Sequence, residues 1–350
     1  MLRMDPFLTD FPVTVDEAVA LIASHQLAGR EVKVVAGGTD AVPNMKHGLF
    51  EPDVVVHIGR VSGLKGVTIV DGALRVGALT TLHDVSLHPL VQQHAPGLAR
   101  AASLVAGPQL RRMGTLGGNI ALDTRCLFYN QTHFWRESLG FCLKKDGTVC
   151  HVIAGGKKCV AAASNDTATM LLCLDASVVL QSPRGTRTLA LADFYVADGI
   201  KNHVLDADEL IVAIVVPVPV PSSTSTSTST STSTKATTTA GQRLQGYAKL
   251  RHRNAIDYPL LSVGVRVDVD GDNVVTAIRC VVSALQARPH KLPIEALVGR
   301  VFDDSVVAEL KAIGFAKCAP VKNIADDPAW RRDMVPVMIQ RAIDDARGVA

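Results

Sequence analysis

The sequence lacks most of the short motifs that identify an enzyme from one stretch of chain. It contains no Gly-x-Gly-x-x-Gly fingerprint, no Gly-x-Ser-x-Gly elbow and no His-Glu-x-x-His helix. An NAD site of the Rossmann type, a hydrolase nucleophile and a zinc-peptidase centre are therefore unsupported. No Cys-x-x-Cys knuckle occurs, so spacing alone identifies no zinc or ferredoxin-type site.

Aromatic residues, net charge and long apolar runs are also scarce. Aromatic residues make up 4% of the 350 residues, and the formal net charge is only +3. No basic run is interleaved with aromatic side chains, so we expect neither nucleic-acid binding nor attraction to a membrane surface. The nearest approach to a membrane-spanning run, residues 210–216, is short and β-branched, which predicts a strand.

The start of the chain and the cysteine count bear on the cellular compartment. Residues 1–6 contain no apolar segment followed by a small-residue cleavage site, so they do not resemble a signal peptide. The seven cysteines are odd in number. We therefore expect reduced thiols and a cytoplasmic location.

The composition describes a globular chain of two or three domains. Hydrophobic residues make up 47% and charged residues 20%. A Ser/Thr tract at residues 222–234, extended to 241, contains no core-forming side chains and predicts a disordered linker. We expect domains or subdomains at residues 1–60, 61–221 and 242–350, with residues 222–241 as the linker.

The first subdomain combines a capped helix with a glycine loop. Thr14 and Glu17 form a capping box that opens a helix, and strands are predicted at residues 32–36 and 53–58. The first strand ends at a loop of two glycines, a threonine and an aspartate (Gly37, Gly38, Thr39, Asp40). Because glycine lets a phosphate approach the backbone N–H groups, this loop is a candidate phosphate site, although most such loops are simple turns.

A second glycine segment lies at residues 107–119, which we expect to form a basic turn. Around it, Asp-Gly pairs predict hairpins at residues 67–77 and 262–283, and a further hairpin is expected at 177–191. Helical patterns near Ile294, at 305–313 and at 328–347 complete an α+β domain at the end of the chain. Pro336 should kink the last helix or shift its start.

Four cysteines follow the second glycine segment within 34 residues: Cys126, Cys142, Cys150 and Cys159. Spacing alone leaves three interpretations open, namely an iron–sulfur cluster, a zinc site that could include His133 or His151, and scattered structural thiols. The lysines and glycines between these cysteines argue against a flat apolar core and would offset the charge of bound thiolates. Cys173 and Cys280 lie in apolar segments and are expected to be buried structural thiols.

Isolated charged residues give weaker signals. Asp123 and Asp166 flank the cysteine segment and could bind ribose or adenine-side hydroxyls, or simply be solvated. The basic segment 247–253 with Asp257 could be an anion clamp or an exposed strand face.

The order of these motifs resembles the FAD-binding subunits of the xanthine oxidase family over nearly the whole chain. The resemblance implies an α+β fold: a two-subdomain FAD-binding domain like that of vanillyl-alcohol oxidase, then a C-terminal domain like that of the CO dehydrogenase flavoproteins. It also implies that both glycine segments hold the FAD pyrophosphate. The implied FAD-binding residues are Ala36, Gly37, Gly38, Thr39, Asp40, Thr115, Gly117, Gly118, Asn119, Asp123, Asp166 and Lys249.

Residues 123–131 and the order of the four cysteines further resemble the β subunits of 4-hydroxybenzoyl-CoA reductases. This resemblance implies that residues 123–160 are an inserted loop whose four cysteines (Cys126, Cys142, Cys150, Cys159) bind a [4Fe–4S] cluster. The implied function is electron relay from an external donor such as ferredoxin, through the cluster and FAD, to a small [2Fe–2S] subunit and a large molybdenum subunit in a dimer of heterotrimers. Two alternatives stay open: the FAD subunit of an oxidative molybdenum hydroxylase that passes electrons outward, and a zinc-stabilised scaffold without catalytic function.

Overall fold

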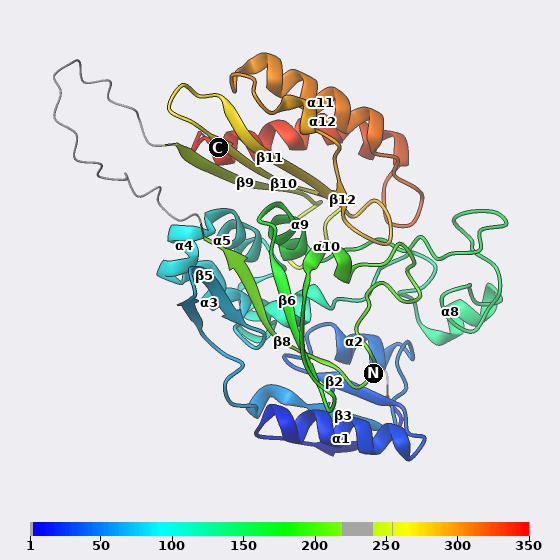
Figure 1. The fold of residues 1–350 in the computed structure, drawn as a ribbon. Coiled ribbons are helices and arrows are strands. Elements are labelled where there is room, and N and C mark those ends of the chain that lie inside the picture. Colours follow the sequence, from blue (N-terminus) through cyan, green and yellow to red (C-terminus); the bar gives the residue numbers. More distant parts are fainter. Residues whose placement is uncertain (1–2, 219–240, 254, 350) are drawn as a thin grey trace.

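Three β-sheets organise the chain, one for each major segment of the sequence (Figure 1). The computed structural model describes residues 3–218, 241–253 and 255–349. The predicted Ser/Thr linker lies outside the described residues except for Gly241. Among the described helices, none combines the length and the apolarity needed to cross a membrane.

The N-terminal sheet is parallel and has the order β1-β3-β2. Its helix α1 begins as the capping box predicts, with the Thr14 hydroxyl accepting the N–H of Glu17 at 3.2 Å. Ala18, Val19 and Ile22 of this helix are buried in the core. The bounds are β1 (Leu8–Asp10), α1 (Val15–Leu27), β2 (Val32–Val35), α2 (Ala41–Lys46), β3 (Val54–His57) and a 3-10 turn η1 (Ile58–Arg60).

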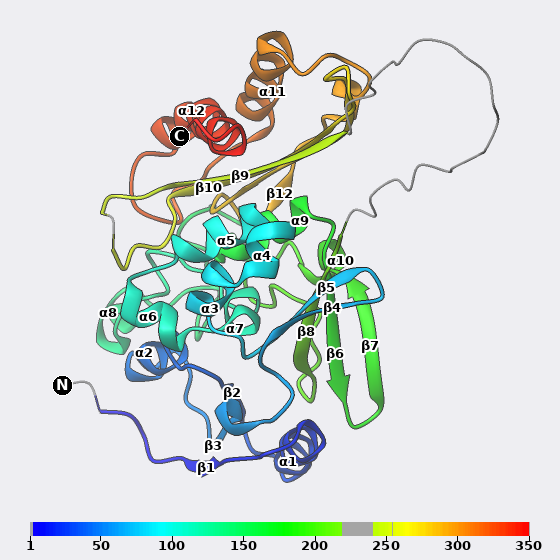
Figure 2. The same ribbon diagram turned by 90° about the vertical axis from the view of Figure 1, so that its left-hand side faces the viewer.

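The middle sheet is antiparallel and has the order β4-β5-β8-β6-β7, which confirms both predicted hairpins. Short helices cover it and share one apolar core with it (Figure 2). The strands are β4 (Val67–Val70), β5 (Ala73–Gly77), β6 (Ser177–Ser182), β7 (Gly185–Ala190) and β8 (Leu210–Pro217). The helices are α3 (Leu82–Leu87), α4 (Pro89–His94), α5 (Pro96–Ser103), α9 (Asp166–Cys173) and α10 (Leu191–Phe194).

The segment 107–119 is not the simple turn that its glycines predicted. It forms two short helices, α6 (Pro108–Met113) and α7 (Leu116–Ile120), separated at Gly114. Proline suits the first position of α6, because an N–H group at that position would have no acceptor within the helix. The Thr115 hydroxyl caps α7 by accepting the N–H of Gly118 at 3.1 Å.

The C-terminal sheet has the order β12-β11-β10-β9 and lies between two layers of helix (Figure 2). Helix α12 covers β9 and β10 on one face and α11 packs on α12, while α5 and α9 lie against the other face. Helix α12 runs through Pro336, and the helix expected near Ile294 is only a 3-10 turn. The bounds are β9 (Gln242–Leu250), β10 (Leu261–Val269), β11 (Val275–Ser283), β12 (His290–Lys291), η2 (Glu295–Leu297), α11 (Asp304–Lys317) and α12 (Pro328–Ala346).

A long segment with little regular structure connects α7 to α9. Its one helix, α8 (His133–Ser138), lies at the side of the molecule, away from the three sheets (Figure 1). All four clustered cysteines belong to this segment. It is tied to the body by buried Arg136, which donates to the Gly48 carbonyl at 2.8 Å and pairs with Asp146 at 3.0 Å.

Candidate functional site

The two glycine segments meet in the structure. A Cβ added to Gly37 would lie 1.8 Å from the carbonyl oxygen of Met113. A Cβ added to Gly114 would lie 3.4 Å from the Thr39 hydroxyl oxygen. The loop after β2 therefore rests directly on the end of α6, a contact that only glycine permits at position 37.

The first glycine loop has free backbone donors. Gly38 adopts a positive φ of 68°, and the loop ends at Asp40, the N-cap of α2. Within the described residues, no protein acceptor pairs with the N–H groups of residues 37–40. Successive unpaired N–H groups in a turn form a concave anion site, so this loop can hold a phosphate. Ala36 joins it to the strand.

The second glycine segment differs from the expectation that its N–H groups face a phosphate. Gly117 donates to the Ala78 carbonyl at 2.9 Å, and Asn119 donates to the Thr115 carbonyl at 2.9 Å. With Gly118 bonded to the Thr115 hydroxyl, the first amides of α7 are occupied. Gly117 is required instead for close packing, because its Cβ would lie 2.8 Å from the Cβ of Ala78.

The side chain of Asn119 also serves the fold. Its amide oxygen accepts the Thr167 N–H at 3.1 Å and the Thr167 hydroxyl at 2.5 Å, which ties α7 to α9. Asn119 is buried.

Asp40 joins three distant parts of the chain. Its carboxylate accepts bonds from Arg125 at 3.1 Å, from the Tyr258 hydroxyl at 2.7 Å and from Asn44 at 2.8 Å. The Arg125 guanidinium lies 3.8 Å from the centre of the Tyr258 ring, within cation–π distance. Burial, together with the negative charge of Asp40, raises the pKa of Tyr258. No pattern in the sequence predicted a role for Tyr258, although it lies beside Asp257 and is one of only four tyrosines.

Asp166 and Lys249, predicted to contact FAD, form an ion pair at 3.0 Å. Their side chains are 4% and 1% exposed. Asp166 also accepts the Tyr247 hydroxyl at 2.8 Å, and Lys249 donates to the Leu104 carbonyl at 3.2 Å. The pair thus joins α9, which packs with the middle sheet, to β9 of the C-terminal sheet. Burial and the adjacent carboxylate raise the pKa of Tyr247.

Two interpretations were open for the basic strand, an anion clamp and an exposed strand face, and the contacts of its side chains do not match a clamp. Arg251 donates to the Leu104 carbonyl at 3.1 Å, and Arg253 binds Asp257 four residues on at 2.6 Å. With Lys249 paired to Asp166, the three basic side chains are directed to different partners.

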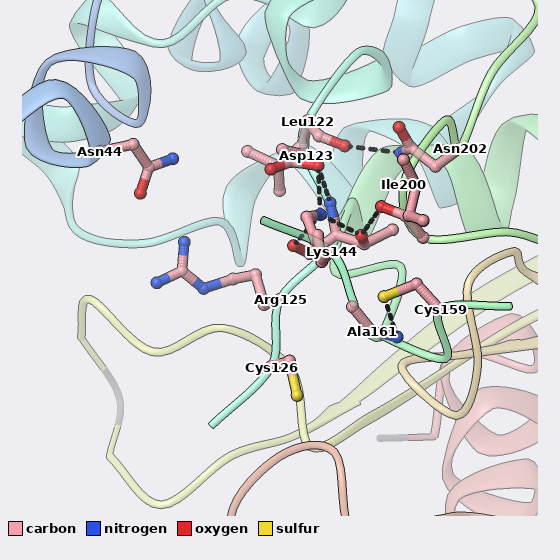
Figure 3. A network of polar contacts seen from close by, with 12 residues as sticks. Asn44, Leu122, Asp123, Arg125, Cys126, Lys144, Cys159, Ala161, Ile200 and Asn202 are labelled. Carbon is pink, nitrogen blue, oxygen red and sulfur yellow. Dashed lines mark hydrogen bonds and ion pairs between the residues drawn. The ribbon is translucent and has the colours of Figure 1, made fainter. Parts of the chain in front are cut away.

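Asp123 lies in a polar network beside the cysteines (Figure 3). Its carboxylate pairs with Lys144 at 2.6 Å, and the same ammonium donates to the Thr124 hydroxyl at 2.6 Å. Lys144 also lies 4.3 Å from the centre of the Tyr129 ring. Burial, reinforced by Asp123, raises the pKa of Tyr129. Burial lowers the pKa of nearby Lys33, although the negative charges of Asp123 and Asp40 act in the opposite direction.

The four clustered cysteines line one hollow, which we call the cysteine hollow. Its volume is small, about 20 Å³, and it is partly open to solvent. Its walls also include Tyr129, Lys144 and His151. Burial raises the pKa of Cys126 to about 12, and the charges of the other three cysteines act in the same direction. Burial also raises the pKa of Cys159.

Backbone donors reach two of these sulfurs. The N–H of Ala161 donates to the Cys159 sulfur at 3.4 Å, and that of Ile153 to the Cys150 sulfur at 3.5 Å. Such bonds stabilise thiolates that ligate a metal centre. Cys173 and Cys280, by contrast, are fully buried in apolar cores, as predicted.

No three His, Cys, Asp or Glu side chains in the described ranges lie close enough together to bind a metal ion. The histidines of the cysteine segment have other contacts. His151 hydrogen-bonds the Phe141 carbonyl at 2.6 Å, and the ring of His133 lies 5.5 Å from the ring of Phe141.

Comparisons with known proteins identify both domains. The family model described as the FAD binding domain in molybdopterin dehydrogenase matches residues 7–219, and the CO dehydrogenase flavoprotein C-terminal domain matches residues 246–346. The nicotinate dehydrogenase FAD-subunit of Eubacterium barkeri is 30% identical over 59% of this chain. The matched region spans only 56% of that relative's length.

Two further matches cover more of the chain. The aldehyde oxidoreductase FAD-binding subunit PaoB of Escherichia coli (strain K12) is 30% identical over 73% of this chain and 76% of that protein. A carbon monoxide dehydrogenase structure from Hydrogenophaga pseudoflava shares the fold, with a TM-score of 0.76, 24% identity and 99% coverage of both chains. The chain therefore belongs to the family of FAD-binding domains in molybdopterin dehydrogenases, as an oxidoreductase flavoprotein with a CO dehydrogenase-type C-terminal domain.

Proposed function

We propose that this chain is the electron-transfer subunit of a cytoplasmic, molybdenum-dependent complex of the 4-hydroxybenzoyl-CoA reductase type, and that it carries both FAD and a [4Fe–4S] cluster. The observation that carries the proposal is the cysteine hollow. Cys126, Cys142, Cys150 and Cys159 line one space although they are spread over 34 residues.

The FAD assignment rests on the family and on the first glycine loop. The unpaired N–H groups of residues 37–40 fit a phosphate group, and Gly38 supplies the left-handed turn that presents them. Thr39 and Asp40 complete the loop. Asp123 and the Asp166–Lys249 pair would act on FAD indirectly, by fixing the elements around it.

The cluster assignment rests on the donor set and its arrangement. Four thiolates are the usual ligands of a [4Fe–4S] cluster. The hollow is lined by all four cysteines and so offers that donor set. Zinc can use the same four thiolates, and the content of iron, sulfide and zinc separates the two. When bound, FAD exchanges one or two electrons and the cluster exchanges one.

The proposed partners follow from the kind of protein that the relatives are. They are named as FAD subunits or medium chains of dehydrogenases and of an aldehyde oxidoreductase. By analogy, we propose a large molybdenum subunit and a small [2Fe–2S] subunit, assembled as a dimer of heterotrimers. An external low-potential carrier such as ferredoxin would supply electrons at the cluster.

Metal analysis of each cysteine variant tests the proposal. Protein purified anaerobically from the native host should contain about four irons and four sulfides per chain, as a [4Fe–4S] cluster requires. Single Cys→Ser changes at Cys126, Cys142, Cys150 or Cys159 should remove them. The same change at Cys173, Cys280 or Cys318 is the matched control and should leave the iron in place.

A second candidate is the FAD subunit of an oxidative molybdenum dehydrogenase that passes electrons outward. It is favoured by the names of the relatives, which include nicotinate and carbon monoxide dehydrogenases. Stoichiometric FAD without iron or sulfide in this chain would select this candidate over the cluster-bearing one. Stoichiometric zinc without sulfide would instead support the alternative in which the cysteines bind zinc and the chain is a scaffold without catalytic function.

A further inference from the structure

Lys144 lies between the Asp123 network and the cysteine hollow (Figure 3). Its ammonium donates to the Asp123 carboxylate at 2.6 Å and to both oxygens of Thr124, the carbonyl at 3.0 Å and the hydroxyl at 2.6 Å. The same residue lines the cysteine hollow. One buried side chain therefore contacts Asp123 and borders the space between the four sulfurs.

The charge of Lys144 is held in a fixed place. Its side chain is 5% exposed, and the three hydrogen bonds restrict the ammonium to one position. The Tyr129 ring, 4.3 Å away, covers another side. In such a poorly hydrated site, a charge acts on its neighbours more strongly than it would in water.

Lys144 and the four cysteines line the same hollow. A fixed cation favours negative charge on a neighbouring group.

We propose that Lys144 is a positioning residue that raises the reduction potential of the group held by the four cysteines. The inference rests on the proposed cluster. Reduction adds one electron, and hence one negative charge, to a cluster ligated by four thiolates. A fixed ammonium stabilises the more negative, reduced state, and net charge near a cluster is one of the terms that set its potential.

The next residue provides a matched control. Lys145 does not line the hollow, is 22% exposed and pairs with Glu51 at 3.2 Å. If Lys144 only braced the loop, replacing it would alter stability but not the potential. The two lysines therefore separate an electrostatic role from a structural one.

The experiment is a redox titration of the purified native complex with dithionite as the electron donor, followed by the EPR signal of the reduced cluster. Lys144→Met should make reduction about tenfold less favourable, which lowers the midpoint by about 59 mV for one electron. Lys144→Arg keeps the charge and should stay close to wild type. Lys145→Met should leave the midpoint unchanged.

Asp123→Asn gives a second test, which remains available if the Lys144→Met variant does not fold. This change keeps the Lys144 ammonium and removes its counter-charge, so the midpoint potential of the cluster should rise. An unchanged midpoint in both Lys144→Met and Asp123→Asn, or an equal shift in Lys145→Met, would overturn the role of Lys144. A wild-type complex without iron would overturn the proposed function as well, which distinguishes the two failures.

Discussion

At Gly37, the loop that follows β2 touches the end of α6 through backbone atoms alone. A Cβ at this position would lie 1.8 Å from the Met113 carbonyl oxygen, and neither group can move without shifting its loop. We expect Gly37→Ala to cost about 1–3 kcal/mol of unfolding free energy, as overpacking does, and to release FAD. Urea unfolding and the flavin absorbance of the purified protein measure the two effects.

Gly107→Ala is the matched control, because its Cβ would meet only the Gln109 side chain, at 3.8 Å. It should retain FAD and stability. Stoichiometric FAD in Gly37→Ala would show that the contact between the loops is not needed for the cofactor.

Individual site residues were predictable where one short stretch determines them. The loop at residues 37–40 has this character, since a strand followed by two glycines exposes N–H groups. Asp166 and Lys249 were predicted to contact FAD, whereas their mutual ion pair joins positions that are 83 residues apart and was not predicted. Tyr258 lies 218 residues from Asp40 and was missed, because no local pattern marks such a contact.

Among the elements, α12 and β9 approach each other closely at one glycine. A Cβ on Gly246 would lie 1.9 Å from the Ala342 carbonyl oxygen. A Cβ on Gly314 of α11 would meet side chains and no backbone, the nearest being Ile339 at 2.4 Å and Val335 at 3.3 Å. Gly246→Ala should therefore destabilise the protein by about 1–3 kcal/mol.

Gly314→Ala should cost less, because Ile339 can change its rotamer and alanine favours a helix interior by about 0.5–1 kcal/mol. Thermal unfolding of the two variants, measured side by side, gives the comparison. An equal decrease in melting temperature in both variants would contradict this prediction. It would mean that α12 shifts at Gly246 as easily as the Ile339 side chain moves at Gly314.

Elements with strong local signals formed where the sequence predicted them. The capping box gave α1, and Asp-Gly pairs gave the β4–β5 and β10–β11 hairpins. Strand β1 is only three residues long and exists through its pairing with β3, so its own sequence does not reveal it. Glycines at both ends of α6 and within α7 hid these two helices. In α7, the Thr115 cap and the packing of Gly117 against Ala78 override a weak intrinsic helix preference.

At the scale of the whole molecule, the buried pair of Asp166 and Lys249 joins the flavin domain to the C-terminal domain. Asp166→Asn would leave the Lys249 ammonium buried without its counter-charge, a change that typically costs about 3–5 kcal/mol. We expect the C-terminal domain to unfold at a lower urea concentration than the flavin domain. Unfolding of the variant should therefore show two transitions instead of one. Fluorescence of Trp330, in α12, reports on the C-terminal domain.

The exposed pair of Arg184 and Asp208 serves as the control, since Arg184 is 59% exposed. Arg184→Ala should leave the urea transition unchanged. A single unshifted transition in Asp166→Asn would show that apolar contacts alone hold the two domains together.

The bond between Asp40 and Tyr258 restricts how this protein can be recombined. The carboxylate belongs to the loop that is proposed to hold the FAD phosphate, whereas the hydroxyl belongs to the segment after β9. A chimera that received residues 246–346 from a relative would need a hydroxyl donor at position 258 and a lysine at position 249. The two domains are thus suited to inheritance as one unit and not as interchangeable modules, even though separate family models describe them.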